Sequence, residues 1–289
     1  MSIEDDYIKI GKDLHVMRVG FGAMKLTGDQ VWGPYPDHDR ALAVLRGAVD
    51  AGVQLIDTAD VYGPHTDELL IREALFPYPS DLVIATKGGF VRGGFEYDTL
   101  SAVGNVNYLR QSAHMSVQRL GVEAIDLYYL HSGTATDAPF EDQVGTLADL
   151  RAAGVIRNVG LSNVTISQLR IAQKIVPIAA FTALFNLTVR RGAELRAAAE
   201  EGDIAFSPWH PVTITDGPLA SRAAEVVPAI ATAHDATVQQ IALAWQLQGS
   251  THSLPIPGTT SLEHLRQNLD ARSITLTDAE MKALDNITS

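Results

Sequence analysis

Four polar side chains follow predicted strands of this 289-residue chain, and their types suit proton transfer to a carbonyl oxygen. They stand in three segments, with Asp57 and Tyr62 in LIDTADVYGP, Lys87 in VIATKGG and His131 in LYYLH. A free tyrosine has a pKa of about 10 and is a poor acid at neutral pH. An ammonium group within hydrogen-bond range stabilises the phenolate and lowers this pKa. We therefore expect Lys87, held in place and kept charged by Asp57, to make Tyr62 a proton donor.

The imidazole of His131 would supply a second hydrogen-bond donor toward the same oxygen. Together the four groups predict a proton source and an electrostatic clamp for an alkoxide that develops from a carbonyl. None of them can deliver a hydride, so carbonyl reduction requires a cofactor, and we expect a nicotinamide. Each residue alone has a structural explanation, such as an ion-paired lysine or a packed tyrosine. Their shared position at neighbouring strand ends is what favours chemistry.

The elements that must carry these residues alternate between strand and helix. Capping-box spacing at Thr165 and Thr277 marks two helix starts. Eight short apolar runs are bounded by Gly, Pro or polar residues, and segments with helical periodicity lie between them. Because most of the runs are apolar on both faces, they predict a parallel sheet covered by helices. The predicted strands are residues 15–22, 54–57, 82–86, 125–130, 156–162, 179–185, 204–208 and 253–257.

Eight strands without a second domain favour a closed (β/α)8 barrel of the TIM type over an open doubly wound sheet. We expect one domain that spans residues 1–289. An N-terminal β-hairpin at 7–14, turning at Gly11-Lys12-Asp13, and a C-terminal helix at 277–287 lie outside the repeat. Two helical segments, 223–234 and 237–248, separate the last two strands, so one of them is extra. In such barrels the chemistry sits where strands end and the following loops begin.

Composition excludes several function classes. The chain is 46% hydrophobic and 19% charged, which is ordinary for a globular protein and unlike disordered or collagen-like chains. Its 22 basic and 34 acidic residues give a net charge of −12, which argues against nucleic acid and anionic membranes as partners. Without cysteine there is no disulfide, thiolate-bound zinc or cysteine nucleophile. The nine histidines lack metal-ligand spacing, so we expect no metal. With no signal pattern and no apolar run of membrane length, we expect a soluble, cytoplasmic protein.

Six segments of this sequence resemble the aldo-keto reductase family. In chain order they are GFGAMKL, LIDTADVYG, ATKGG, LYYLH, VGLSN and IPGTTSLEHLRQN, and the likeness extends over about residues 7–287. The resemblance implies a (β/α)8 barrel and NADPH-dependent reduction of aldehydes and ketones. It also implies that the catalytic residues are Asp57, Tyr62, Lys87 and His131, with Tyr62 as the proton donor.

The resemblance further implies a set of cofactor-binding positions. Ser162 and Asn163 match the pair that holds the nicotinamide carboxamide, and Thr182 stands where the family usually has Gln. Phe206 takes the place of the aromatic residue that stacks on the nicotinamide. At the 2′-phosphate, His264 replaces a basic residue of many members, so NADH stays open beside NADPH. The full expected set is Ala23, Met24, Asp57, Ser162, Asn163, Thr182, Phe206, Ser207, Pro208, Thr259, Ser261, His264, Gln267 and Asn268.

Aromatic residues near the predicted strand ends indicate a flat or apolar substrate. We expect Trp32, Tyr62, His131 and Trp209 to contact it, and the Gly-bearing segment 91–106 to add another wall. The strings IREALFPYPSDLVIATK, VWGP and FSPWHP are similar to the bacterial pyridoxal-reductase branch of the family. Pyridoxal is therefore the leading substrate hypothesis. Other aromatic or sugar-derived carbonyls, and alcohol oxidation, remain open.

Two other functions compete with carbonyl reduction. A Schiff-base lyase would use Lys87 as an amine nucleophile, although Asp57 and Tyr62 would keep this lysine protonated. A nicotinamide-binding regulatory subunit with little turnover, similar to the potassium-channel β subunits of the same fold, would act through a partner protein. We expect the partner to be a small-molecule carbonyl substrate instead, and the chain to be a monomer or a weak homo-oligomer.

Overall fold

Parallel strands form the centre of the structure, a computed structural model that describes residues 6–287. Seven of them pair in the order β11-β10-β9-β8-β5-β4-β3, and every neighbouring pair is parallel. Such strands need helical crossovers and are buried on both faces, which explains their continuous apolar runs. The strands are β3 (Phe21–Gly22), β4 (Leu55–Asp57), β5 (Val83–Gly88), β8 (Ile125–Leu130), β9 (Ile156–Ser162), β10 (Ile178–Leu184) and β11 (Ala205–Trp209).

The segment 252–257 closes the gap between β11 and β3. Its hydrogen bonds are Phe206 N to His252 O at 2.8 Å, Leu254 N to Phe206 O at 2.8 Å, Gly20 N to Pro255 O at 3.0 Å and Gly22 N to Pro257 O at 3.3 Å. Pro255 and Pro257 have no N–H to donate, so the ladder is incomplete on this segment. The predicted eighth strand thus lies in its expected place as an extended connection, and the curled sheet has the form of the predicted (β/α)8 barrel.

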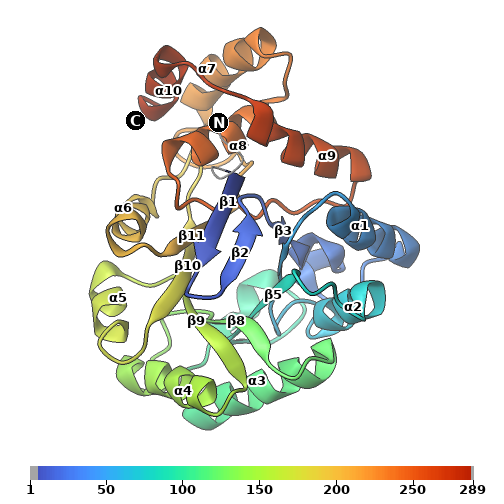
Figure 1. Cartoon of the computed structure of the whole chain (residues 1–289), viewed down its shortest axis with the longest axis vertical. Helices are drawn as coiled ribbons and strands as arrows, with labels where there is room; N and C mark the ends of the chain where they lie inside the picture. The colour runs from blue at the N-terminus through green and yellow to red at the C-terminus, as the bar shows by residue number, and fades with distance from the viewer. Residues whose placement is uncertain (1–5, 288–289) are drawn as a thin grey trace.

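Helices cover the outer face of this sheet (Figure 1). Three of them, α5, α8 and α10, begin with a complete capping box at Thr165, Thr237 and Thr277. Two helices, α7 and α8, lie between β11 and the closing segment, as predicted. The helices are α1 (His38–Asp50), α2 (Thr66–Leu75), α3 (Val106–Leu120), α4 (Phe140–Ala152), α5 (Ile166–Ala172), α6 (Ala193–Gly202), α7 (Ala220–Ala233), α8 (Val238–Gly249), α9 (Leu262–Asp270) and α10 (Asp278–Asp285).

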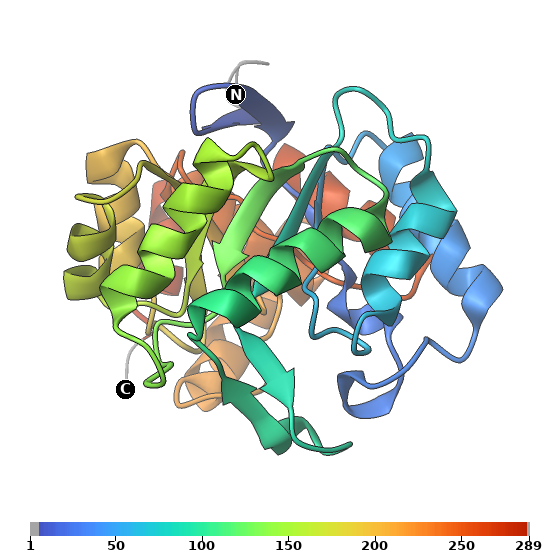
Figure 2. The ribbon, with the colours of Figure 1, turned by 90° about the horizontal axis from the view of Figure 1, so that it is seen from below.

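The predicted first strand, 15–22, is wrong as one element. Residues 14–17 are β2 (Leu14–Met17), which pairs antiparallel with β1 (Tyr7–Ile10), and only Phe21–Gly22 joins the barrel. The hairpin turns at Gly11, whose φ of 61° suits glycine. Its apolar side chains pack into the barrel interior with Leu55 and Val83. Figure 2 shows this hairpin, in blue, capping one end of the barrel, while a second hairpin, in teal, projects from the other end.

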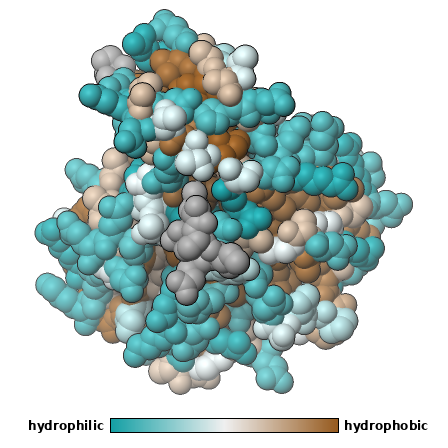
Figure 3. Space-filling model, turned by 45° about the horizontal axis from the view of Figure 1, so that its top comes forward, coloured by the Kyte–Doolittle hydropathy of each residue, from teal (hydrophilic) through white to brown (hydrophobic). Residues whose placement is uncertain are grey.

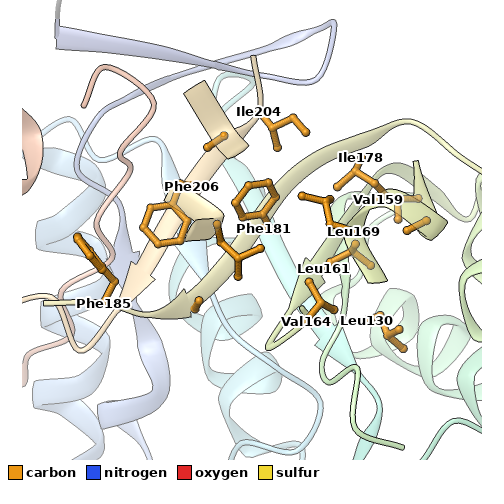
Figure 4. Close-up of a cluster of buried hydrophobic side chains, with 14 of the residues drawn as sticks. Leu130, Val159, Leu161, Val164, Leu169, Ile178, Phe181, Phe185, Ile204 and Phe206 are labelled. Atoms are coloured by element: carbon orange, nitrogen blue, oxygen red, sulfur yellow. The ribbon is translucent and has the colours of Figure 1, made fainter. Parts of the chain in front are cut away.

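The core has an inner and an outer layer. The inner layer fills the barrel with side chains such as Leu127 and Ala205, together with those of the N-terminal hairpin. The outer layer lies between the strands and the helices, and it includes Leu161, Phe181 and Phe206 (Figure 4). Successive strand residues point to opposite faces, so each strand serves both layers.

The molecular surface in Figure 3 is mainly hydrophilic, with smaller apolar patches between the polar side chains. This agrees with helices that turn one apolar stripe toward the sheet and a polar face toward solvent. Across residues 6–287, no helix combines the length and the apolar character needed to cross a membrane.

Candidate active site

A cavity of about 320 Å³ opens at the carboxyl ends of the parallel strands. Asp57, Tyr62, Lys87 and His131 all line it. Asp57 ends β4, Lys87 lies in β5, and His131 follows β8, and these three strands are neighbours in the sheet. Tyr62 comes from the loop after β4. The structure therefore brings together the four residues that the sequence predicted to share one site.

Lys87 and Asp57 form a buried ion pair. The ammonium Nζ lies 2.5 Å from Asp57 Oδ1 and also donates to the carbonyl oxygen of Thr58 at 2.8 Å. Both side chains are almost fully buried. Burial raises the pKa of Asp57, although the charge of Lys87 and its hydrogen bond oppose that rise. Two fixed acceptors hold Lys87, so its ammonium group keeps one orientation in the cavity.

The pKa of the Tyr62 phenol shifts in the direction opposite to that predicted from the sequence. Burial, followed by the charge of Asp57, raises its pKa well above the ordinary value of 10.0. Lys87 Nζ lies 5.5 Å from the centroid of the Tyr62 ring, and its short hydrogen bonds go to Asp57 and Thr58 instead. The net shift is therefore upward, opposite to the expected one, and burial is its largest cause. Tyr62 is a neutral phenol that keeps its proton.

His131 is a buried, neutral imidazole. Its ring contacts Tyr62 edge-on at 6.0 Å between centroids and Phe90 at 4.7 Å. Burial, and then the charge of Lys87, lowers its pKa well below 6.5. Its Nδ1 atom is buried without a hydrogen-bond partner among the described residues. A neutral imidazole has one N–H group, so the ring can donate one hydrogen bond without carrying a charge.

In addition to Asp57, three polar residues of the expected cofactor set form a patch on the cavity wall. Ser162, Asn163 and Thr182 line the cavity at the ends of β9 and β10, and Met24 lines it near β3. Asn163 Nδ2 donates to Ser162 Oγ at 3.0 Å. The hydroxyl of Thr182 is buried and has no partner in the described part of the chain. An amide group has the donors and the acceptor that this patch lacks, so these residues fit the carboxamide of a nicotinamide.

Phe206 is not placed to stack on a ring in the cavity. It has no exposed surface and packs in the outer core, 5.9 Å from both Phe181 and Phe185 between ring centroids (Figure 4). Trp209, three residues later on β11, does line the cavity, as expected for a substrate contact. Strand alternation explains the difference, because residues an odd number apart on a strand face opposite sides. Ala23, Ser207 and Pro208 are buried and do not line the cavity either.

Trp32 also differs from its predicted position. It does not line the cavity and is 39% exposed. Its ring packs edge-on against Phe95 and lies over the guanidinium group of Arg92. Trp32 therefore does not line the cavity where we expected it, and it packs against Arg92, which does line the cavity.

The residues expected at the adenosine end lie around the start of α9, next to the cavity rather than in it. Ser261 Oγ caps α9 by accepting from His264 N, and Thr259 Oγ1 accepts from Ser261 N at 3.1 Å. The other two, Gln267 and Asn268, lie on α9 itself. These residues follow Gly258 in the chain, and Gly258 itself lines the cavity.

Two cations near this end were not predicted. Lys25 is exposed and lines the cavity. Arg40, on α1, donates from Nε to the carbonyl oxygen of Thr260 at 2.7 Å. Lys25 lies within the GFGAMKL string, so the sequence held a signal for it. Nothing in the sequence pairs Arg40 with Thr260, because 220 positions separate them.

The predicted loop at 91–106 is a β-hairpin followed by the start of α3. Strands β6 (Phe90–Arg92) and β7 (Leu100–Ala102) pair antiparallel, and four residues of the hairpin line the cavity. The segment therefore forms part of the cavity wall, as expected. These four residues are Phe90, Arg92, Tyr97 and Leu100.

Buried carboxyl groups lie behind the cavity. Thr58 Oγ1 donates to Asp67 Oδ2 at 2.6 Å, and burial raises the pKa of Asp67 to about 8. Ser112 Oγ donates to Asp60 Oδ2 at 2.6 Å, and burial raises the pKa of Asp60 to about 7. Because Thr58 also accepts from Lys87, Asp67 supports the ion pair from outside the cavity. In the part of the chain that the structure describes, no three acidic or histidine side chains are grouped to hold a metal.

Comparison with known proteins gives concordant matches. Residues 18–289 match the model of the Aldo/keto reductase family. An uncharacterized oxidoreductase of Schizosaccharomyces pombe is 40% identical over 278 residues, covering 96% of this chain and 88% of that protein. Pyridoxine 4-dehydrogenase of Escherichia coli is 36% identical over 278 residues, covering 94% and 95%. A crystal structure of an aldo-keto reductase from Klebsiella pneumoniae in complex with NADPH has a TM-score of 0.79 at 24% identity, covering 98% and 94%.

Proposed function

Because this chain belongs to the aldo/keto reductase family and is therefore an oxidoreductase, we propose that it reduces an aldehyde or ketone to an alcohol with NADPH. The observation that carries the proposal is the meeting of Asp57, Tyr62, Lys87 and His131 in one cavity. A buried ion pair, a neutral phenol and a neutral imidazole supply the acid and the hydrogen-bond donor that carbonyl reduction needs.

The cofactor supplies a hydride to the carbonyl carbon when it is bound. Ser162, Asn163 and Thr182 would hold its carboxamide, since they present a polar patch with an unpartnered hydroxyl. Lys25 would meet the phosphate groups with a positive charge. Thr259, Ser261, His264, Gln267 and Asn268 would surround the adenosine end, beside the guanidinium of Arg40.

Tyr62 gives its proton to the carbonyl oxygen as negative charge develops there. A raised phenol pKa does not prevent this, because an alkoxide is a stronger base than a phenolate. His131, neutral and buried, donates a hydrogen bond to the same oxygen and needs no proton exchange with solvent. The Lys87 ammonium, fixed 5.5 Å from the Tyr62 ring centroid, stabilises the phenolate that remains after the transfer.

Pyridoxal is the substrate that we propose first. The relative from Escherichia coli is named a pyridoxine 4-dehydrogenase, and it matches this chain over nearly the whole of both proteins. The cavity is lined by the rings of Phe90, Tyr97 and Trp209, which suit a flat aromatic aldehyde. Its volume of about 320 Å³ lies at the lower end of the usual range for small-molecule sites.

The geometry opposes a Schiff-base lyase. An amine nucleophile must be uncharged, whereas Lys87 Nζ donates to a carboxylate and to a carbonyl oxygen at short distance. The regulatory-subunit hypothesis predicts cofactor binding with little turnover, so kinetics separates it from the proposal.

The test is NADPH consumption at 340 nm with pyridoxal, 4-nitrobenzaldehyde and methylglyoxal. We expect multiple turnovers, and a loss of about 10²–10⁴-fold in kcat for Tyr62→Phe. Tyr35→Phe, which removes a phenol oxygen outside the cavity, should keep wild-type rates. NADPH binding by Tyr62→Phe, followed through cofactor fluorescence, should be unchanged. Binding without turnover in the wild-type protein would favour the regulatory subunit, and an active Tyr62→Phe would exclude Tyr62 as the proton donor.

A further inference from the structure

Arg92 joins two segments that are distant in sequence and form one side of the cavity. From the hairpin β6–β7, its Nη1 donates to the carbonyl oxygens of Gln30 at 2.8 Å and Val31 at 3.3 Å. Its Nη2 donates to the carbonyl oxygen of Phe95. No carboxylate in residues 6–287 forms a salt bridge with this guanidinium. Its charge is therefore balanced by backbone dipoles.

Two aromatic rings flank the same guanidinium group. Its Cζ lies 5.2 Å from the ring centroid of Trp32 and 5.6 Å from that of Tyr97. Both distances are within the range of cation–π attraction. Tyr97 N also donates to Gln30 Oε1 at 3.1 Å, so a second bond joins the two segments. Residues 30–32, 92 and 97, which we call the Arg92 wall, are thus held as one unit.

The backbone that Arg92 holds is strained. Gln30 and Val31 have φ angles of 56° and 57°, in the left-handed region that a β-branched residue such as Val31 rarely adopts. Strain of this kind persists only where the surroundings enforce it. Both strained carbonyl groups accept from Arg92. The guanidinium is therefore one of the contacts that keep this turn in place.

The strained turn is also tied to the loop of the proton donor. Gly63 N donates to Val31 O at 3.1 Å, and Gly33 N donates to Gly63 O at 3.0 Å. Gly63 directly follows Tyr62, so the Arg92 wall is fixed relative to Tyr62. Val31, Arg92 and Tyr97 all line the cavity together with Tyr62.

We propose that Arg92 is a positioning residue that sets the substrate range, by holding the Arg92 wall against the cavity so that a flat aromatic carbonyl is enclosed beside Tyr62. This inference rests on the proposed carbonyl reduction. Without the fork of N–H donors, the turn at Gln30 and Val31 loses two of its bonds and relaxes, and Tyr97 loses its cation–π partner. An aromatic substrate then loses apolar contact, whereas a small aliphatic carbonyl, which does not reach the wall, is unaffected.

The experiment compares Arg92→Met with the wild-type protein on 4-nitrobenzaldehyde and methylglyoxal. We expect KM for 4-nitrobenzaldehyde to rise about tenfold, while kcat/KM for methylglyoxal and the Kd for NADPH each change less than twofold. Arg110→Met serves as the matched control, because Arg110 forms an exposed ion pair with Asp149 away from the cavity. An equal loss with both aldehydes, or an unchanged ratio of the two kcat/KM values, would overturn the proposal.

Two further measurements keep the outcome decisive. Arg92→Lys retains the charge but lacks the planar group of N–H donors that binds several carbonyl oxygens. We expect it to lower the ratio of kcat/KM for 4-nitrobenzaldehyde to kcat/KM for methylglyoxal by about threefold, with a wild-type Tm. Binding of 4-nitrobenzaldehyde without NADPH, followed by quenching of tryptophan fluorescence, needs no turnover. A weaker Kd in Arg92→Met supports the wall even if no carbonyl is reduced, whereas equal Kd values refute it whatever the catalytic result.

Discussion

Burial governs the chemistry of single residues in this site more than the nearest charge does. Tyr62 stands near an ammonium group and yet has a raised pKa, because burial and then the charge of Asp57 raise it. His131 is neutral because burial lowers the pKa of its imidazole. The sequence predicts which residues meet, since strand ends converge in a barrel, but it carries no measure of desolvation. The direction of the Tyr62 shift could therefore not be predicted from residue types alone.

The roles of Lys87 in stability and in catalysis can be separated. Lys87→Met leaves the buried Asp57 carboxylate without its cation, so we expect the free energy of unfolding to fall by about 3–5 kcal/mol. The double variant Asp57→Asn/Lys87→Met has no unpaired charge and should recover most of that loss. Turnover should stay at least about 10²-fold below wild type in both, because the phenolate of Tyr62 has lost its cation. Urea unfolding and NADPH consumption measure the two effects.

Recovery of turnover in the double variant would contradict this assignment. It would mean that Lys87 only neutralises Asp57. Thr237→Ser, which keeps a capping hydroxyl at the start of α8, is a suitable control for handling and refolding.

At the scale of elements, the pattern of apolar residues explains why most strands were predicted correctly. The alternation of side chains along a strand explains the wrong prediction for Phe206. Most predicted strands appear within a few residues of their expected bounds, because buried parallel strands have a clear apolar signature. Phe206 and Trp209 were both assigned to the cavity although they are three residues apart on β11, and only Trp209 faces it. Applying strand alternation to the sequence would have removed Phe206. The division of 15–22 into a hairpin strand and a barrel strand has no comparable signal.

The contact between α1 and the start of α9 predicts how the chain selects its cofactor. Arg40 Nε holds the carbonyl oxygen of Thr260, which places a guanidinium beside the proposed 2′-phosphate position near His264. We expect Arg40→Gln to raise KM for NADPH by about three- to tenfold, the value of one exposed charge-assisted hydrogen bond, and to leave KM for NADH unchanged. Arg46→Gln is the matched control, since Arg46 lies on the same helix and donates to Ala74 O instead. Equal changes with both cofactors would place the 2′-phosphate elsewhere.

At the scale of the whole molecule, the acidic residues are not confined to the surface. The chain has a net charge of −12, and it also buries Asp57, Asp60, Asp67 and Glu68 behind or within one cavity. Glu68 is paired with Arg119, and Asp57 with Lys87, whereas Asp60 and Asp67 are held by neutral hydroxyl donors. Composition predicts an acidic protein but not which carboxyl groups fold inside. Those that fold inside without a cation should make the stability of the protein depend on pH.

Asp67 allows the sign of that dependence to be tested. Its pKa is about 8 in the folded protein and near 3.8 when exposed, so between these values the folded state holds one more proton than the unfolded state. The free energy of unfolding then falls as pH rises through this window, by about 1.4 kcal/mol per pH unit for one such group. Asp67→Asn removes this contribution and leaves that of Asp60 in place. We expect its stability, measured by urea unfolding at pH 5.5, 6.5 and 7.5, to decline less steeply than that of the wild-type protein.

The comparison of slopes is needed because the amide group introduced by Asp67→Asn would also be short of a partner, a cost that does not vary with pH. Asp50→Asn is the control, because it removes a carboxylate that is exposed to solvent at the end of α1. Its plot of unfolding free energy against pH should be parallel to that of the wild-type protein. If the Asp67→Asn curve were parallel as well, Asp67 would have to be ionised in the folded protein. Its carboxylate would then draw on the positive charge of Lys87 through Thr58, and the ion pair behind Tyr62 would be a three-residue network instead.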